Sequence, residues 1–289
     1  MSLLQILLSG IAAGCVYALV ALSFVLIYKS TDAVSFMQGE LMMSGAFAAL
    51  ASGSFLALPW WLGLAFALAM TALAGAGIER LVIRRAAGQA HMAVVMLTLG
   101  LGMMLRGLVG LVPAWSSQTH ALPLPVTGVW RTGGLAVSVE QLAVAGLTSA
   151  FCLGFWLFYR HTRTVLALRA CAENASAAAL MGVAVPRMHT LVWALAAAMA
   201  AFAGVLLAPI TFVHAGMGLI ALKSFAAAVL GGMASLPGTL AGGLLVGVVE
   251  AAAGYALPEG FKEAAVWLLL LAVMFWRPGG LAAGRGLGR

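Results

Sequence analysis

The chain is dominated by apolar runs that are long enough to cross a lipid bilayer. The six clearest runs are residues 3–28, 33–52, 56–76, 92–112, 139–159 and 188–208. A bilayer core about 30 Å thick requires roughly 20 apolar residues in a helix, and these runs meet that length. Hydrophobic residues make up 64% of the sequence and charged residues only 8%, which excludes a water-soluble globular domain. The sequence therefore predicts an all-α polytopic membrane protein, with residues 1–289 as a single transmembrane domain.

A further apolar stretch, residues 221–254, is interrupted in its middle. The pair Gly231-Gly232 and the segment Ser235-Leu236-Pro237-Gly238 break helical continuity there. Non-helical backbone at membrane depth is tolerated only where protein or a water-filled cavity covers it, so this break belongs inside the bundle. The stretch is either two short spans or a re-entrant hairpin, and a last span follows at 263–276. We expect a helical bundle of about seven to nine transmembrane segments.

Lysine and arginine are distributed unevenly among the connecting loops. Eleven of the fifteen fall in residues 29–32, 77–91, 160–187 and 277–289. Only Arg131 and Lys262 fall in the remaining loops. Because cytoplasmic loops carry the excess of Lys and Arg, we expect an external N-terminus and a cytoplasmic C-terminus. The net charge of +7 is thus a topology signal and does not indicate a nucleic-acid partner.

Two local patterns predict structural detail. Glycines four residues apart occur at Gly10 and Gly14, at Gly238 and Gly242, and at Gly243 and Gly247. This spacing clears one helix face for close packing against another helix. In the external loop 113–138, the segment Thr132-Gly133-Gly134 favours a small hairpin.

Four ionisable residues lie within or at the edge of apolar segments: Glu40, Arg106, Lys223 and Glu250. A charge at the bilayer centre costs on the order of 3 kcal/mol, so each is a functional candidate. Arg106 is close enough to the outer end of its helix for its side chain to reach the interface. Lys223 and Glu250 are interpreted as interfacial. Glu40 is the strongest candidate.

Glu40 stands in a polar segment that precedes small and flexible residues. Gln38 and Glu40 supply hydrogen-bond donors and acceptors, and Gly39 permits close approach of backbone. We expect Gln38, Gly39 and Glu40 to line a substrate pathway. The alternative is a helix N-terminus that is capped by Asp32 or Ser35, with Glu40 as a first-turn charge.

The longest internal loop, residues 160–187, contains an alanine-rich stretch that predicts a short helix. Gly182 suits the left-handed position that ends such a helix. A narrow stripe of small residues consists of Leu168, Ala172, Ala175 and Ala179. Arg169 and Glu173 lie on another face. A helix this smooth fits the groove of a partner protein; the alternative is an interfacial helix resting on the bilayer.

Four segments together carry a family resemblance. They are Gly10–Tyr28 with Gly-Cys-Val-Tyr-Ala-Leu, Phe36–Ala46, Arg169–Gly182 with Arg-Ala-Cys-Ala-Glu-Asn, and Gly231–Gly238 with Gly-Gly-Met-Ala-Ser-Leu-Pro-Gly. Over almost its full length the chain resembles the permease subunit of branched-chain amino acid ABC importers. The resemblance implies that the segment at 160–187 couples to an ATPase through Arg169, Glu173 and Gly182.

The resemblance also implies a setting for the chain. It implies the cytoplasmic (inner) membrane, two ATP-binding subunits, a second permease subunit that forms a heterodimer with this one, and a periplasmic or extracellular solute-binding protein. The substrate would be a branched-chain or other small amino acid. The chain itself carries no Gly-x4-Gly-Lys-Ser/Thr phosphate loop, as expected for a subunit that relies on separate ATPases.

Two other classes of function fit the sequence less well. A proton- or sodium-coupled secondary transporter of small organic solutes would place a membrane carboxylate at a midplane helix break, and Glu40 is the one tolerable candidate. An enzyme is disfavoured because the five histidines are scattered and form no nucleophile or metal constellation with Ser, Asp or Cys. We therefore expect no catalytic residue, no metal site and no cofactor.

Overall fold

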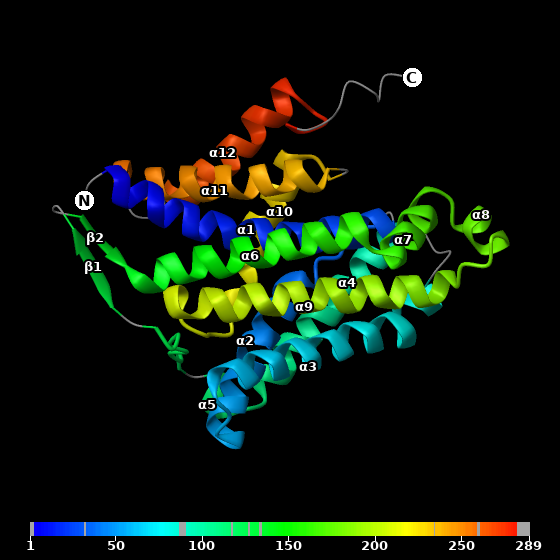
Figure 1. Ribbon diagram of the computed structural model, residues 1–289, viewed down its shortest axis with the longest axis horizontal. Coiled ribbons are helices and arrows are strands. Elements are labelled where there is room, and N and C mark those ends of the chain that lie inside the picture. The colour runs from blue at the N-terminus through cyan, green and yellow to red at the C-terminus, as the bar shows by residue number, and fades with distance from the viewer. Residues whose placement is uncertain are drawn as a thin grey trace.

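The computed structural model describes residues 3–31, 33–86, 91–116, 118–126, 128–132, 135–233, 235–258 and 261–281. Long helices lie lengthwise beside one another and form a bundle (Figure 1). The N-terminus and a small hairpin lie at one end of this bundle, and two short helices, α7 and α8, lie at the other. Within the described residues, six helices are long and apolar enough to cross a membrane. The prediction of an all-α polytopic membrane protein is confirmed.

The elements follow the expected order along the chain. The helices of the bundle are α1 (Leu3–Thr31), α2 (Gln38–Leu56), α3 (Trp60–Leu81), α4 (His91–Gly110), α6 (Val139–His161), α9 (Val185–Thr211), α10 (Ile220–Gly231), α11 (Leu236–Ala256) and α12 (Phe261–Trp276). The short elements are α5 (Pro113–Ser116), α7 (Arg163–Glu173), α8 (Ala175–Leu180) and the 3-10 turns η1 (Ile83–Ala86) and η2 (Met217–Leu219). Strands β1 (Val129–Thr132) and β2 (Leu135–Ser138) pair antiparallel and confirm the hairpin; Gly133 and Gly134 lie outside the described residues.

Helices α1 and α9 form the centre of the bundle. Both are mostly buried, whereas α3, α4 and α6 expose most of their length. Helix α1 packs against α6, α9, α10 and α11, and α9 packs against α2 and α3. An apolar helix that is buried on all sides marks the core of a membrane bundle, and an apolar helix that is exposed faces lipid.

Small residues bring α1 and α11 into close contact, as their spacing predicts. A Cβ added to Gly10 would lie 2.9 Å from Cα of Val248, and one added to Gly14 would lie 2.9 Å from Cα of Leu244. On the facing helix, Gly243 packs against Ala18 and Gly247 packs against Gly14. The absence of side chains lets the two backbones come into van der Waals contact. This contact stabilises the helix pair, because the hydrophobic effect contributes little to association between helices in lipid.

The interrupted stretch at 221–254 forms two antiparallel helices, α10 and α11. Gly231 packs against Gly238, and Gly242 packs against the carbonyl oxygen of Ala227. Twelve residues give α10 a length of about 18 Å, which is short for a bilayer core. The chain near the C-terminus covers the break, where the amide of Leu281 donates to the carbonyl oxygen of Leu230 at 2.8 Å. Protein therefore satisfies the non-helical backbone here, as the sequence analysis requires.

Helix α2 begins later than its apolar run predicts. The run starts at residue 33, but residues 33–37 are not helical and α2 starts at Gln38. Tertiary contacts hold this segment: the amide of Phe36 donates to Thr98 Oγ1 at 3.3 Å, and the Phe36 ring lies 5.4 Å from the ring of Phe225. A composition pattern does not report these contacts, so the expected start of the helix was wrong by one turn or more.

Candidate functional site

The first turn of α2 lies in the interior of the bundle. Gln38 is fully buried, and Ser35 before it is 1% exposed. Gly39 packs directly against the carbonyl oxygen of Gly218 in η2, so that a Cβ at position 39 would collide with it. Because glycine has no Cβ, the first turn of α2 and the turn before α10 can meet at this point. The predicted pathway segment therefore lies where the start of α2 contacts η2.

Glu40 is half-buried and lies between η2 and α4. A Cβ added to Gly218 would lie 2.9 Å from Glu40 Oε1, and one added to Gly102 would lie 3.3 Å from Glu40 Cγ. Gly102 stands near the middle of α4, so the carboxylate lies well away from either end of that helix. Two glycines thus make room for one carboxylate inside the bundle.

Several polar atoms around this turn have no hydrogen-bond partner within the described part of the chain. They are Ser35 Oγ, Gln38 Nε2, Gln38 Oε1 and Glu40 Oε2, all of them buried. Buried polar atoms are hydrogen-bonded in the great majority of cases, and exceptions gather at functional sites. These donors and acceptors are available to the polar groups of a solute.

The alternative interpretation of Glu40 is correct in one respect and wrong in another. Glu40 does lie in the first turn of α2, where the helix dipole favours a negative charge. Ser35 does not cap the helix, because the N-cap residue is Met37 and it makes no side-chain capping bond. Asp32 lies outside the described residues. The amide groups that open α2 therefore lack a side-chain cap.

The other three ionisable residues of the apolar segments lie at two different positions: Arg106 on α4, and Lys223 together with Glu250. Arg106 is exposed on α4. Lys223 Nζ lies 2.7 Å from Glu250 Oε1 and 3.2 Å from Glu263 Oε1, so that one ammonium group joins α10, α11 and α12. The side chains of Lys223 and Glu250 are each 14% exposed. The pairing of Lys223 with Glu250 could not be predicted from the sequence, because 27 positions separate the two residues and no local pattern pairs them.

The alanine-rich segment at 160–187 forms two helices, α7 and α8, so the prediction of one short helix was wrong. Asn174 is extended (φ −156°, ψ 98°) and ends α7. Its side-chain Oδ1 accepts a hydrogen bond from the amide of Ala177 at 2.9 Å and caps α8. Asparagine favours this capping role over a helix interior, which explains the break. Gly182 has a φ of +84° and occupies the left-handed position that the sequence predicts.

Helix α7 is anchored to the bundle by one face. Val165, Leu168 and Cys171 are buried. Arg169 Nη2 donates to the carbonyl oxygen of Tyr159 at 3.0 Å, and its guanidinium carbon lies 4.5 Å from the centre of the Tyr159 ring. Glu173 is exposed. The predicted small-residue stripe is therefore divided, since Leu168 faces inward and its three alanines are exposed.

Two apolar side chains at the tip of α8 were not predicted from the sequence. Leu180 is 90% exposed and Met181 is 85% exposed. Helix α8 projects from the end of the bundle (Figure 1). Large apolar residues that are exposed at a protruding tip indicate a contact surface for another protein or for the bilayer. The signal in the sequence was the pair of bulky residues between the alanine run and Gly182.

A charged network next to this segment was also missed. Arg84 donates from Nε to Glu79 Oε1 at 3.1 Å and from Nη2 to Glu79 Oε2 at 2.8 Å. The hydroxyl of Thr190 lies 2.6 Å from Glu79 Oε2, and Arg84 Nη2 also donates to the carbonyl oxygen of Pro186 at 2.9 Å. Glu79 is 3% exposed. The network fixes the end of α3 to the start of α9, where the chain leaves α8.

No group of three or more His, Cys, Asp or Glu in the described part of the chain could hold a metal ion. The structure instead offers an interior polar turn at the start of α2 and, at one end of the bundle, the projecting helices α7 and α8 next to the start of α9.

The chain is similar to known permease proteins over nearly its full length. The high-affinity branched-chain amino acid transport system permease protein BraD of Pseudomonas aeruginosa is 31% identical, over 96% of this chain and 95% of its own length. The corresponding permease protein LivH of Escherichia coli is 30% identical, over 96% and 94%. The solved structure of PsaBC from Streptococcus pneumoniae in complex with Fab aligns with a TM-score of 0.49 and 16% identity, over 96% of this chain and 91% of that one.

The family model described as "Branched-chain amino acid transport system / permease component" matches residues 6–276. That match covers nearly the whole bundle, including α2 and the segment from α7 to Gly182. The chain is therefore a multi-pass membrane protein that belongs to the family of branched-chain amino acid transport permease components.

Proposed function

We propose that this chain forms the translocation pathway of an ATP-driven (ABC) importer for branched-chain or other small amino acids. Membership of the permease family along almost the whole chain supports this proposal most directly. The names of the relatives specify high-affinity branched-chain amino acid transport. The interior polar turn at the start of α2 supplies the local chemistry that such a pathway needs.

The polar turn suits a zwitterionic solute. The carboxylate of Glu40 can accept hydrogen bonds from an α-ammonium group, and the uncapped amides at the start of α2 can donate to an α-carboxylate. Gln38 can do either. Half-helix ends that face a solute in this way are common at binding sites near the bilayer midplane. In this proposal Gln38 and Glu40 face the pathway, and Gly39 holds α2 against η2.

The proposed assembly contains further subunits. Two ATP-binding subunits lie on the cytoplasmic side, a second and different permease subunit lies beside this chain, and an external solute-binding protein delivers the amino acid. The location is the cytoplasmic (inner) membrane. The Lys and Arg residues at the end of the bundle that carries α7 and α8 support a cytoplasmic position for that end.

Reconstitution into proteoliposomes tests the proposed function. Uptake of radiolabelled leucine should require ATP on the cytoplasmic side, the ATP-binding subunits and the binding protein, and it should persist when proton and sodium gradients are collapsed. Uptake by the chain alone that follows a proton or sodium gradient would favour a secondary transporter instead.

Glu40→Gln is expected to lower the rate of leucine uptake about tenfold or more, while the complex remains assembled. A hydrogen bond to a charged group contributes roughly 1.5–3 kcal/mol, and 1.4 kcal/mol corresponds to a factor of ten. Uptake in proteoliposomes measures the effect. The matched control is Glu140→Gln, which removes the same charge in the first turn of α6. Wild-type uptake by Glu40→Gln would leave Glu40 as a first-turn charge only.

The segment from Arg163 to Gly182 is proposed to receive the motion of an ATPase. Exposed Glu173 and the apolar pair Leu180 and Met181 offer a charge and two anchors to a partner surface. Pro186, four residues after Gly182, is bound through its carbonyl oxygen to Arg84. A displacement of α8 is thereby transmitted to both α9 and α3.

Glu173→Lys is expected to reduce ATPase association strongly, because an unmatched charge in a partly desolvated interface typically costs several kcal/mol. Co-purification of the ATP-binding subunits and substrate-stimulated ATP hydrolysis measure the loss. Gly182→Val should uncouple hydrolysis from uptake, since a β-branched residue resists a φ of +84°. The control, Glu140→Lys, makes the same reversal at the opposite end of the bundle. Full assembly and full coupled turnover in Glu173→Lys would exclude this residue from the interface.

A further inference from the structure

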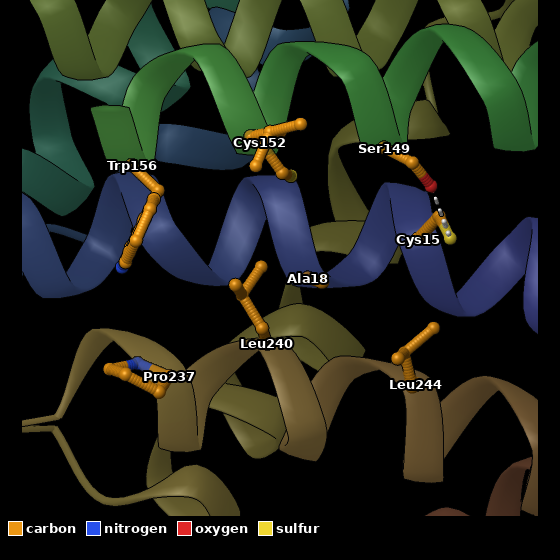
Figure 2. Close-up of a pocket in the computed structure, with 9 residues that line it drawn as sticks. Cys15, Ala18, Ser149, Cys152, Trp156, Pro237, Leu240 and Leu244 are labelled. Atoms are coloured by element: carbon orange, nitrogen blue, oxygen red, sulfur yellow. Dashed lines mark hydrogen bonds between the residues drawn. The ribbon is translucent and has the colours of Figure 1, made fainter. Parts of the chain in front are cut away.

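An apolar groove of about 440 Å³ runs between α6 and α11, with α1 between these two helices (Figure 2). Its lining includes Ala18, Cys152, Trp156, Pro237, Leu240 and Leu244. The one polar pair in the lining is satisfied internally, because Cys15 Sγ lies 3.7 Å from Ser149 Oγ. Leu153 on the wall of the groove is 58% exposed, so the groove opens on the outer surface of the bundle.

The groove continues into a second pocket of about 810 Å³ at the cytoplasmic end of the bundle. Trp156 and Pro237 line both spaces. The second pocket is basic, since Lys29, Arg160 and Arg169 line it. One continuous surface therefore changes from apolar to cationic at Trp156.

Two of the three cations in this pocket, Lys29 and Arg160, are available to a ligand, whereas Arg169 is held by the carbonyl oxygen and the ring of Tyr159. Within the described part of the chain, no carboxylate forms a salt bridge with Lys29 or Arg160. The Arg160 guanidinium lies 5.2 Å from the centre of the Trp156 ring, which holds its charge at the boundary with the groove. Glu173 also lines the pocket, so three cations stand against one carboxylate. The remaining charge attracts an anion.

The dimensions fit one leaflet of a bilayer. Along α6, eleven residues separate Ser149 in the groove from Arg160 in the pocket, a rise of about 17 Å. Half of a hydrocarbon core about 30 Å thick is about 15 Å. The groove thus extends from near the bilayer midplane to the level of the cytoplasmic headgroups.

We propose that this groove and pocket together bind one anionic phospholipid of the cytoplasmic leaflet. An acyl chain lies between Trp156, Leu240 and Leu244, and the phosphate lies between Lys29 and Arg160. Basic pockets between membrane helices on the cytoplasmic side are suited to acidic lipid headgroups. Because α6 and α11 both pack on α1 across the groove, the bound lipid fills the space between them and stiffens this side of the bundle. The site is separate from the pathway at Glu40.

Lipid titration of the full chain in mild detergent, with any subunits that remain bound, tests the proposal. Native mass spectrometry should detect one tightly bound palmitoyl-oleoyl phosphatidylglycerol, in preference to palmitoyl-oleoyl phosphatidylcholine. Lys29→Gln and Arg160→Gln should each raise the half-saturating phosphatidylglycerol concentration roughly fivefold, the effect expected of one basic residue at an anionic surface. The matched control is Arg187→Gln, which removes an exposed cation from the same end of the bundle outside the pocket.

A second measurement locates the acyl chain. Phosphatidylglycerol with a diazirine in its acyl chain should label peptides that contain Trp156 or Leu240, and Leu240→Trp should abolish this labelling by filling the groove. Equal binding of the two lipids, or labelling confined to other helices, would overturn the proposal. Saturation by inorganic phosphate alone would assign the pocket to a soluble anion. Loss of a protein subunit without loss of lipid in Arg160→Gln would assign the surface to that subunit.

Discussion

Replacing Arg84 by glutamine is expected to lower the free energy of unfolding by about 3 kcal/mol, the lower end of the range for breaking a buried ion pair. Glu79, its partner, is 3% exposed and keeps a negative charge inside the bundle when the guanidinium is gone. The hydroxyl of Thr190, 2.6 Å from Glu79 Oε2, still compensates part of that charge. Arg84 itself is 39% exposed, which also limits the cost.

Thermal unfolding in detergent, followed by loss of monodisperse protein, measures this effect. The matched control is Arg85→Gln, because Arg85 is the exposed neighbour of Arg84 in η1 and its loss should change stability by less than about 0.5 kcal/mol. Adding Glu79→Gln to Arg84→Gln should recover part of the stability, since it removes the uncompensated charge. Equal stability of Arg84→Gln and Arg85→Gln, or no recovery in the double variant, would show that the pair is not energetically coupled.

Gly247→Leu is expected to destabilise the bundle by about 3 kcal/mol or more, at or above the upper part of the usual range for overpacking. Gly247 in α11 packs directly against the backbone of Gly14 and the carbonyl oxygen of Gly10 in α1. Any side chain at position 247 must push two backbones apart, because the atoms that it meets are not movable side chains. The contact between α1 and α11 is the largest between any two helices of the described chain.

The same measurement of thermal unfolding applies, with Gly100→Leu as the matched control. A Cβ added to Gly100 on α4 meets nothing within 4 Å, so leucine there should be tolerated. Gly247→Ala should give an intermediate loss, since even one carbon overlaps the α1 backbone. A Gly247→Leu protein as stable as the wild type would mean that α1 and α11 are free to separate.

Several features of the fold could be predicted from the sequence: the membrane-spanning helices, one close helix contact and two local turns. The apolar runs predict the helices of the bundle, because a chain that crosses lipid must satisfy its backbone hydrogen bonds internally. Apolar side chains of sufficient length along the chain therefore indicate a helix. Glycine spacing predicts the contact between α1 and α11 for a related reason, since close approach requires small residues at fixed intervals on both helices. Gly182 and the hairpin were predictable because backbone conformation is a local property.

The sequence proposes the residues of the candidate site but does not give their geometry. Composition singled out Gln38, Gly39 and Glu40, yet it placed the start of their helix at residue 33. Only the tertiary structure places Gly39 against Gly218 and the carboxylate of Glu40 between Gly218 and Gly102. Similarly, Lys223 and Glu250 are visible as charges, but their pairing is a contact between two helices.

By itself, the sequence determined that this is a helical membrane protein, which end of the bundle carries most of the positive charge, and which family its motifs resemble. Those properties depend on the free energy of transferring residues between water and lipid, or on short motifs. Both can be evaluated from the amino-acid sequence. The tertiary structure alone decided that α2 begins inside the bundle and that Arg84 reaches Thr190 and Pro186. These features depend on contacts between residues that are far apart in the chain, such as Arg84 and Thr190, which are 106 positions apart. No local sequence pattern predicts such contacts.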